Sequence, residues 1–317
     1  MSQKAPGKAH RNGISLVDLF RMFPDDSAAQ AWFERARWGA KPWCPYCGSV
    51  NVQSGCQHKS MPYRCREKGC AKRFSVRVGT PMHRSHLSYQ TWAIAVYLLT
   101  TSLKGVSSMK LHRDLKITQK SAWYLAQRIR ETWASDGEPF TGPVEVDETY
   151  FGGRRKNMSN AKRRELVKVG GRGPVGKAAV VGAKDRKTKK VAAKVVERTD
   201  GPTLQGFVRK HAAPDAKVYT DEAAAYQGMA FDHETVKHSL SEYVNGDVHT
   251  NGIESLWSML KRAHKGTFHK LSPKHLDRYV QEFAGRHNMR ESDTLAQMEL
   301  VVRGFEGKRL TYADLTE

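Results

Sequence analysis

The stretch PVEVDETYFGG, residues 143–153, places three carboxylates within four positions. Valines alternate with Glu145 and Asp147, a period of two that is typical of a strand, and Glu148 follows directly. Acidic residues are depleted in ordinary strands. Either this stretch is a solvated acidic edge, or an acid is needed at the strand end for a chemical reaction.

Two later segments carry further acids in comparable positions. In the segment AKVYTDEAAAY, the expected strand AKVYT is followed directly by Asp221 and Glu222. The segment HTNGIESLWSMLKRAHKG is typical of a helix with an apolar stripe. Glu254 and Lys261 are seven residues apart in it, so two helical turns place them on one face.

Metal binding is the chemistry that would need these acids together. Carboxylates from two strand ends and one nearby helix can converge on one point. Magnesium prefers such oxygen ligands, and two divalent ions about 4 Å apart can promote phosphodiester displacement. Simpler roles remain open: Asn251 and Glu254 have capping-box spacing, and Asp221 could be a first-turn helix acid. Three separate simpler roles, in an order along the chain that also builds a metal site, are less plausible than the metal site itself.

Two cysteine pairs have metal-ligand spacing. CPYCGS and YRCREKGCAKRFS supply two knuckles, and these predict one structural Zn²⁺ bound by four sulfurs: Cys44, Cys47, Cys65 and Cys70. The alternative is a set of buried thiols. Cys56 falls outside both knuckles and is expected to be a free thiol, with His58 as a less well spaced substitute ligand. Basic residues around the second knuckle favour a nucleic-acid partner: Arg64, Arg66, Lys68, Lys72, Arg73 and Arg77.

The stretch SSMKLHRDLKITQKSAWYLAQRIRETW has the layout of a helix-turn-helix, with helices over 107–115 and from Gln119 onward. The polar residues Gln119 and Lys120 at the start of the second helix suit an approach to the DNA major groove. Gln119, Lys120 and Arg128 are the expected DNA contacts of this helix. An ordinary helical pair within a bundle is the alternative. The deciding observation is whether Lys120 and Arg128 lie on a surface free of other protein.

The charge balance favours a polyanionic partner. The 317 residues carry a net charge of +21 with a pI near 9.8, and nucleic acid is the commonest partner of such chains. A basic ribosomal or membrane-surface protein is the alternative. The first dozen residues lack the apolar core of a signal peptide, and the run from Trp92 to Leu99 is too short for a bilayer. We expect a cytoplasmic protein with no membrane partner.

Composition and periodicity predict how the chain is organised. An N-terminal helical segment (1–40) is followed by the cysteine-bearing module (41–80) and the helical region (85–136), and strands then alternate with helices over 140–317. The expected strands are VEVDE, KAAVVGA, KKVAAKVVE, AKVYT and ETVKHS. The expected helices lie near 202–212, 250–264, 273–288 and 293–305.

Over about residues 40–290 the chain resembles the DDE transposases of bacterial insertion sequences, in the branch with a zinc ribbon. The motifs that carry the resemblance are CPYCGS, YRCREKGCAKRFSVRVGTPM, VEVDETYFGG, VYTDEAAAY and HTNGIESLWSMLKRAHKGTFHKLSPKHLDRYVQEFAGRHNMR. The resemblance implies an α/β ribonuclease H-like catalytic domain over residues 140–317, preceded by the zinc ribbon and the helix-turn-helix region. It identifies Asp147, Asp221 and Glu254 as ligands of two Mg²⁺ or Mn²⁺ ions, and Lys261 as the basic residue that follows the glutamate.

Neighbouring residues are expected to support these ligands. His249 and Asn251 lie just ahead of Glu254 and could orient it or contact DNA. Glu145 shares the strand face of Asp147 but lies further from its end, and Glu148 is expected to point the other way. We therefore expect Asp147 to be the one metal ligand of its stretch.

Residues 152–173 carry eight Lys or Arg residues against one acid. Their glycine-rich ends predict a mobile basic loop over the active site that orders against DNA phosphates; a solvated loop is the alternative. The expected phosphate contacts are Arg154, Arg155, Lys156, Lys162, Arg163 and Arg164.

The expected function is transposition. The zinc ribbon and helix-turn-helix would bind the terminal inverted repeats, and the acidic site would free a 3′-hydroxyl that attacks target DNA. Such a protein would act as a homodimer or larger assembly on DNA, near the bacterial nucleoid. The alternatives are a DNA-binding regulator or domesticated transposase that does not cut, and an endonuclease for structured DNA.

Overall fold

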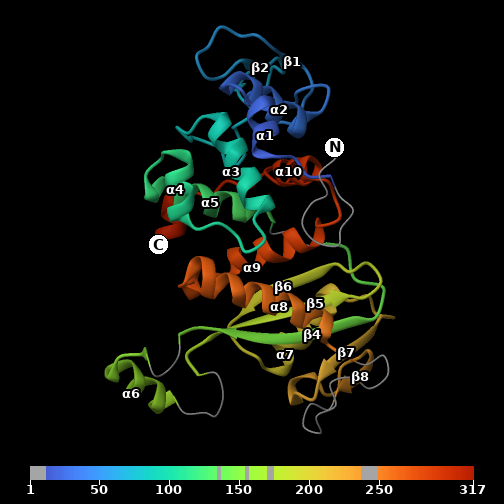
Figure 1. Ribbon diagram of the computed structural model, residues 1–317. Helices are drawn as coiled ribbons and strands as arrows, with labels where there is room; N and C mark the ends of the chain where they lie inside the picture. Colours follow the sequence, from blue (N-terminus) through green and yellow to red (C-terminus); the bar gives the residue numbers. More distant parts are fainter. Residues whose placement is uncertain (1–11, 134–136, 154–156, 170–174, 237–248) are drawn as a thin grey trace. The chain divides into compact units, whose positions relative to one another are not determined.

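The computed structural model describes residues 12–133, 137–153, 157–169, 175–236 and 249–317. The chain divides into two compact units, one of Met1–Ala134 with Met289–Glu317 and one of Ser135–Asn288 (Figure 1). Each unit has its own apolar core. Among the described residues, none of the helices combines the length and apolar composition that a bilayer-spanning helix requires.

The first unit is mainly helical. Its helices begin where the sequence supplies capping side chains, as at Ser88 for α3, Ser107 for α4 and Thr118 for α5. The helices are α1 (Leu16–Met22), α2 (Asp26–Trp38), α3 (Tyr89–Thr101), α4 (Ser108–Leu115), α5 (Gln119–Arg130), the 3₁₀ turn η1 (Glu131–Trp133), α10 (Thr294–Arg303) and α11 (Tyr312–Thr316). Among the described residues, the helices expected within 1–40 and 85–136 are thus present.

The C-terminal segment packs into this first unit, whereas the sequence analysis assigned it to the catalytic domain over 140–317. Met298 and Val302 of α10 and Phe305 just after it are buried in the same core as α2 and α3. The ring of Phe305 lies 6.0 Å from Trp92 and 6.2 Å from Phe33. The apolar side of α10 therefore completes a core built by helices some 200 residues earlier.

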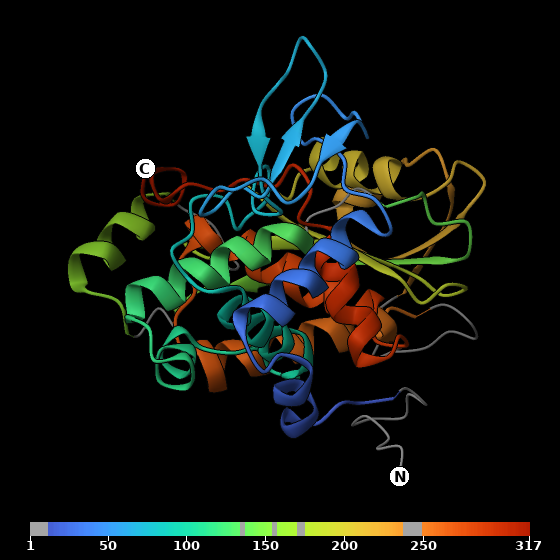
Figure 2. The same ribbon diagram turned by 90° about the horizontal axis from the view of Figure 1, so that it is seen from above.

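The cysteine module is a three-stranded antiparallel sheet in the order β1-β2-β3, drawn as blue arrows in Figure 2. Its strands are β1 (Val52–Gln53), β2 (Tyr63–Cys65) and β3 (Arg73–Phe74). The rings of Tyr63 and Phe74 stack 5.6 Å apart, and both contact Trp38 of α2 edge-on. With strands this short, the apolar core of the module is small.

The second unit is built on a five-stranded mixed sheet in the order β6-β5-β4-β7-β8. β4, β5 and β6 are antiparallel neighbours, while β7 is parallel to β4 and β8 is parallel to β7. This mixed α/β arrangement fits the expected ribonuclease H-like fold. The strands are β4 (Val144–Phe151), β5 (Ala178–Asp185), β6 (Val191–Val196), β7 (Lys217–Asp221) and β8 (Asp232–Val236).

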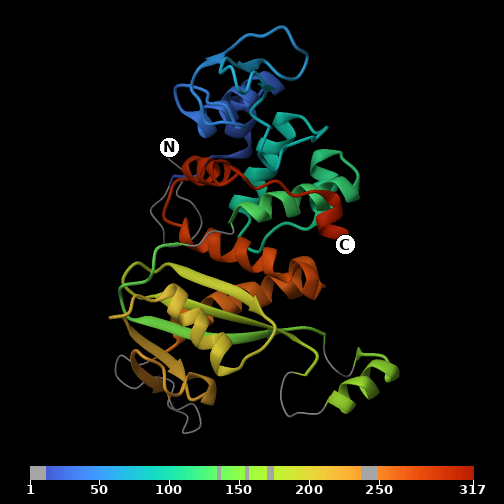
Figure 3. The ribbon, with the colours of Figure 1, turned by 180° about the vertical axis from the view of Figure 1, so that it is seen from behind.

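Helices cover both faces of this sheet. α8 (Asn251–Ala263) and α9 (Pro273–Asn288) pack on one face, and α7 (Gly201–His211) packs on the other, which Figure 3 shows from behind. Valines alternate with acids along β4 because the two faces of the sheet pack on different helices. Its valines face α7, while Glu145 and Asp147 face α8. The sheet thus brings the acids of β4 against the helix that carries Glu254.

Helix α9 runs along the outer edge of β6 and supplies hydrogen bonds to it. Asp277 accepts from Val195 N at 2.9 Å, and Gln281 donates to the carbonyl of Ala193 at 2.8 Å. Asn288 both accepts from and donates to the backbone of Val191. These side chains satisfy backbone groups that an edge strand otherwise leaves unpaired.

The basic insertion contains a helix where the sequence predicted a loop. α6 (Asn160–Val169) occupies the middle of residues 152–173. The run AKRRELVK, without glycine or proline, has good intrinsic helix propensity, which the sequence analysis gave too little weight.

Candidate active site

Asp147 and Asp221 lie side by side because of the register of two parallel strands. The pairing of β4 with β7 includes Val144 with Val218, and the same offset aligns Asp147 with Asp221. Ligand oxygens of Asp147, Glu148 and Asp221 all lie within 4.8 Å of one another. Asp147 was expected to lie at the end of its strand, but β4 continues to Phe151. The opening beside Asp147 arises because the neighbouring strand β7 ends at Asp221.

The carboxylate of Glu148 belongs to this acid cluster, and the expectation that it points away was wrong. Its side chain leaves the strand toward the α7 face, where the hydroxyl of Tyr226 donates a hydrogen bond to Glu148. Because β7 ends at Asp221, no strand separates this carboxylate from the other two. Tyr226 lies in the 3₁₀ turn η3 (Ala224–Tyr226), which follows β7 directly.

Glu254 lies on the first turn of α8 and lines a cavity of about 520 Å³ together with Asp147 and Glu148. Its carboxylate accepts a hydrogen bond from Thr250 Oγ1 at 3.1 Å. The capping box considered for Asn251 and Glu254 does not form, because Asn251 is already helical and Thr250 is the N-cap. The apolar stripe expected on this helix is buried: Ile253, Leu256, Trp257 and Leu260.

Glu145 caps α8 from the neighbouring strand. Its side chain is 2% exposed and accepts a hydrogen bond from the backbone N–H of Ile253 at 3.0 Å. Arg186 Nε lies 2.7 Å from the same carboxylate, and Arg186 also donates to the carbonyl of His249 at 2.6 Å. The ring of His249 lies 3.5 Å from Glu145. His249 therefore contacts Glu145, while Asn251 is exposed at the start of the helix.

The indole of Trp257 orients Asp147. Its Nε1–H donates to Asp147 Oδ2 at 3.0 Å. The ring lies over Gly182, the β5 residue opposite Asp147, where an added Cβ would lie 2.5 Å from the indole Cη2. Glycine at this position thus permits the close contact between α8 and the sheet.

Burial and the charges of neighbouring acids make the carboxylates of Asp147 and Glu148 hard to ionise. Burial, followed by the charges of Asp221 and Glu254, raises the pKa of Asp147 to about 6. Burial also raises the pKa of Glu148 to about 7, with Asp221 and Asp147 adding to it. A divalent cation would relieve this repulsion, and clustered carboxylate oxygens are the ligands that Mg²⁺ and Mn²⁺ prefer. The donor set therefore fits such an ion.

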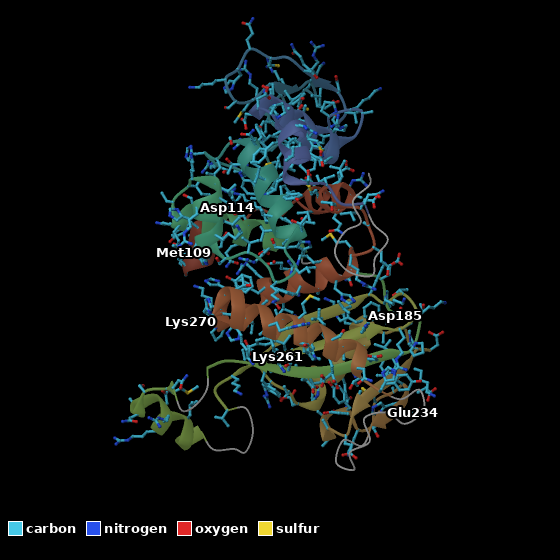
Figure 4. All side chains as sticks on the ribbon, viewed as in Figure 1. Met109, Asp114, Asp185, Glu234, Lys261 and Lys270 are labelled. Carbon is cyan, nitrogen blue, oxygen red and sulfur yellow. The ribbon has the colours of Figure 1, made fainter. Side chains whose placement is uncertain are left out.

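Basic side chains line the other side of the cavity. Lys261, labelled in Figure 4, lies two turns after Glu254, and Arg262 and Lys265 line the same cavity. Lys265 belongs to a π-helical turn (His264–Phe268) that continues α8. Arg262 and Lys265 were not among the residues predicted from the sequence, although the i, i+4 spacing of Lys265 from Lys261 could have indicated Lys265.

The four predicted cysteines converge. The Sγ atoms of Cys44 and Cys70 are 3.7 Å apart, those of Cys47 and Cys65 are 3.6 Å apart, and all four lie within 4.8 Å of one another. Thiolates held at about 2.3 Å from a tetrahedral zinc ion are roughly 3.8 Å apart. The cluster is thus compatible with a zinc ribbon. Cys56 and His58 lie outside it, and His58 Nδ1 instead accepts from the backbone of Ser60 and Met61.

The helices expected for a helix-turn-helix are present as α4 and α5, joined through Lys116 in the left-handed conformation with φ of 50°. Gln119 is exposed, and its amide donates to Ser108 Oγ at 2.9 Å. Lys120 is also exposed, with its ammonium 4.5 Å from the ring centre of Tyr312. These two side chains have the accessibility that a DNA contact requires.

Arg128 does not have that accessibility, which corrects its assignment as a DNA contact. It is 4% exposed, donates to the carbonyl of His83, and its guanidinium lies 4.9 Å from the ring centre of Tyr124. Arg77, counted with the basic residues of the ribbon, likewise donates to the carbonyls of Ser85 and Leu87. Both arginines stabilise the first unit.

The structure describes part of the basic insertion, residues 152–173. Arg163 and Arg164 are exposed on α6, and Arg163 donates to Asn160 Oδ1 at 2.6 Å. The predicted contacts Arg154, Arg155 and Lys156, and the side chain of Lys162, lie outside the described residues.

Sequence similarity links the chain to proteins of transposable elements. Residues 139–288, which contain the acid cluster and its cavity, match the ISXO2-like transposase domain. The chain is 26% identical over 284 residues to an uncharacterized protein in the transposable element ISH50 of Halobacterium salinarum, covering 85% of this chain and 93% of that protein. It is 29% identical over 119 residues to an uncharacterized transposase-like protein of Haemophilus influenzae, covering 36% of this chain and 95% of that protein. Residues 139–288 are therefore similar to the ISXO2-like transposase domain, and these similarities support the resemblance of the chain to the DDE transposases of insertion sequences.

Proposed function

We propose that the protein binds the terminal inverted repeats of an insertion sequence and catalyses metal-dependent DNA cleavage and strand transfer through Asp147, Asp221 and Glu254. The observation that carries the proposal is the register that sets Asp147 beside Asp221, next to a cavity lined by Glu254 and Lys261. The match of the surrounding residues to a transposase domain supports it.

The three acids would hold two Mg²⁺ or Mn²⁺ ions, which supply charge stabilisation for phosphodiester displacement. Lys261 would neutralise a phosphate of the scissile strand as a point charge. Water would attack the phosphorus at the element end and the P–O3′ bond would break. The departing 3′ oxygen would take up the proton that the water loses, which gives a free 3′-hydroxyl. That hydroxyl would then attack a target phosphate, so one phosphodiester bond forms as another breaks and no covalent protein–DNA link is needed.

Other parts of the chain would bind and position DNA. Gln119 and Lys120 at the start of α5 are accessible candidates for major-groove contacts, and Arg163 and Arg164 of α6 for phosphate contacts. A Zn²⁺ ion held by the four cysteines would stabilise the ribbon. Because two element ends must be joined, the active form on DNA would be a homodimer or larger assembly.

Cleavage of end DNA tests the proposal. Wild-type protein with Mg²⁺ and a duplex that carries the element's own end should release a 3′-hydroxyl product and then form joined product with target DNA. Asp221→Ala should lose about 100- to 1,000-fold in rate, since removing a charge-stabilising group in an active site typically costs that much. Glu222→Ala is the matched control, because Glu222 is the exposed neighbour of Asp221 and lies outside the acid cluster.

Three outcomes would contradict parts of the proposal. Wild-type protein that binds the ends without cutting them would identify a DNA-binding regulator. Cutting of branched DNA without joined product would identify an endonuclease. Equal cutting by Asp221→Ala and wild type would exclude Asp221 from the reaction.

A further inference from the structure

We propose that Glu148 is a fourth carboxylate of the metal centre and that Tyr226 positions it there; this rests on the proposed function above. The proposal concerns a residue that strand alternation alone would assign to the opposite face from Asp147.

The end of β7 makes this arrangement possible. β4 continues to Phe151, but its parallel neighbour stops at Asp221, so none of the described strands pairs with β4 beyond that point on the β7 side. From the α7 face, the Glu148 carboxylate reaches the opening beside Asp147 and lies within 4.8 Å of ligand atoms of Asp147 and Asp221. Glu254 lies outside this tightest cluster, with its carboxylate bonded by Thr250.

Tyr226 is held rigidly enough to position Glu148. Its side chain is fully buried, at 0% exposure, in the apolar core under α7. The turn that carries it is fixed at both ends: Asp221 Oδ1 accepts from Ala223 N at 3.1 Å, and Gln205 of α7 donates to the carbonyls of Ala225 and Gln227. Asp221, a proposed metal ligand, and Tyr226, which orients Glu148, are therefore both held in the short segment 221–227.

The charge balance gives Glu148 a chemical role. Two divalent cations carry four positive charges, while Asp147, Asp221 and Glu254 supply three negative ones. A fourth carboxylate would neutralise the pair, and the number of charged ligands tunes the affinity of such sites. Tyr226 has the character of an outer hydrogen-bonding partner, of the kind whose loss typically lowers metal affinity about 10- to 100-fold.

Manganese binding by the full chain without DNA tests the role of Glu148 independently of catalysis. Titration calorimetry should show that Glu148→Gln, which keeps the shape but removes the charge, binds Mn²⁺ at least about tenfold more weakly than wild type. Tyr226→Phe, which removes the orienting hydroxyl, should also bind more weakly, and Glu148→Asp should recover part of the loss. Glu222→Gln should bind as wild type does.

The outcomes separate the two proposals. If Glu148→Gln and Tyr226→Phe bind Mn²⁺ as tightly as wild type while Asp221→Asn does not, the fourth carboxylate is wrong and the proposed function stands. If wild type itself neither binds Mn²⁺ nor cuts end DNA, the proposed function fails. Should Glu148→Gln not fold, Tyr226→Phe decides alone, since a wild-type affinity in that variant overturns the positioning role.

Discussion

Trp257 and Asp147 are joined by a hydrogen bond of 3.0 Å from the indole Nε1–H to the carboxylate Oδ2. The bond connects the helix that carries Glu254 to the strand that carries Asp147, and the two residues are 110 positions apart in the chain. The same ring packs over Gly182. One side chain therefore fixes both the distance of α8 from the sheet and the orientation of a proposed metal ligand.

Trp257→Phe should separate orientation from packing. Phenylalanine fills most of the space but cannot donate to Asp147, so we expect cleavage of end DNA to fall about tenfold or more. The loss of one hydrogen bond should cost only about 1 kcal/mol in the free energy of unfolding. Cleavage at the wild-type rate by a folded Trp257→Phe protein would show that the bond does not orient Asp147 for reaction.

Gly182→Ala should destabilise the second unit. The new Cβ would lie 2.5 Å from the Trp257 ring, and such overpacking typically costs about 1–3 kcal/mol. Gly206→Ala in α7 is the control, because its nearest contact is the end of the Arg209 side chain at 3.9 Å. Helix propensity should make that variant as stable as wild type or more so. Urea unfolding measures both, and equal stability of the two variants would contradict the steric argument.

Glu145→Ala should be among the most destabilising substitutions in the domain. It leaves Arg186 without its carboxylate partner and the N–H of Ile253 without its acceptor. Removing one partner of a buried ion pair costs about 3–5 kcal/mol. A double-mutant cycle with Arg186→Ala, followed by urea unfolding, gives the coupling. A coupling near zero would mean that the two residues stabilise the fold independently.

The metal-free protein should lose stability as the pH rises from 4 to 7. Burial raises the pKa of Asp147 to about 6 and that of Glu148 to about 7, above their unfolded values. The folded state therefore binds more protons than the unfolded state in this range, and its stability falls as they are released. Asp147→Asn should flatten this dependence. Melting temperatures without added Mg²⁺ measure it; the same slope in both proteins would contradict the assignment.

Added Mg²⁺ should reverse the trend with pH, because the metal binds the ionised carboxylates. The rise in melting temperature produced by Mg²⁺ should accordingly be larger at pH 7.5 than at pH 5.5. A rise that does not depend on pH would place the bound ion elsewhere.

Each chain should contain one zinc ion. Cys44→Ser should lose the metal and much of the folding of the ribbon, since small metal modules draw their folding free energy from the ion. Cys56→Ser is the matched control and should retain one zinc, because Cys56 lies outside the four-sulfur cluster. Elemental analysis of the purified proteins measures this. Zinc-free wild-type protein, or equal zinc in both variants, would refute the site.

Local patterns in the sequence predicted most elements of the second unit. Period-two alternation predicted the strand β4, and strand-like segments predicted β5, β6 and β7. Helical spacing identified the buried stripe of α8. Knuckle spacing brought the four cysteines together. These features depend on neighbours within a few residues, so the sequence determines them directly.

Tertiary structure decided the features that depend on distant partners. Strand alternation sends Glu148 away from Asp147, yet the end of β7 leaves an opening where their carboxylates meet. Arg128 has the polarity of a DNA contact, but the packing of α5 buries it. The sequence therefore determined which residues are acidic, basic or apolar along each element. The tertiary structure decided which of these residues share a site. The point where each neighbouring element ends determines which side chains are buried by it and which stay accessible.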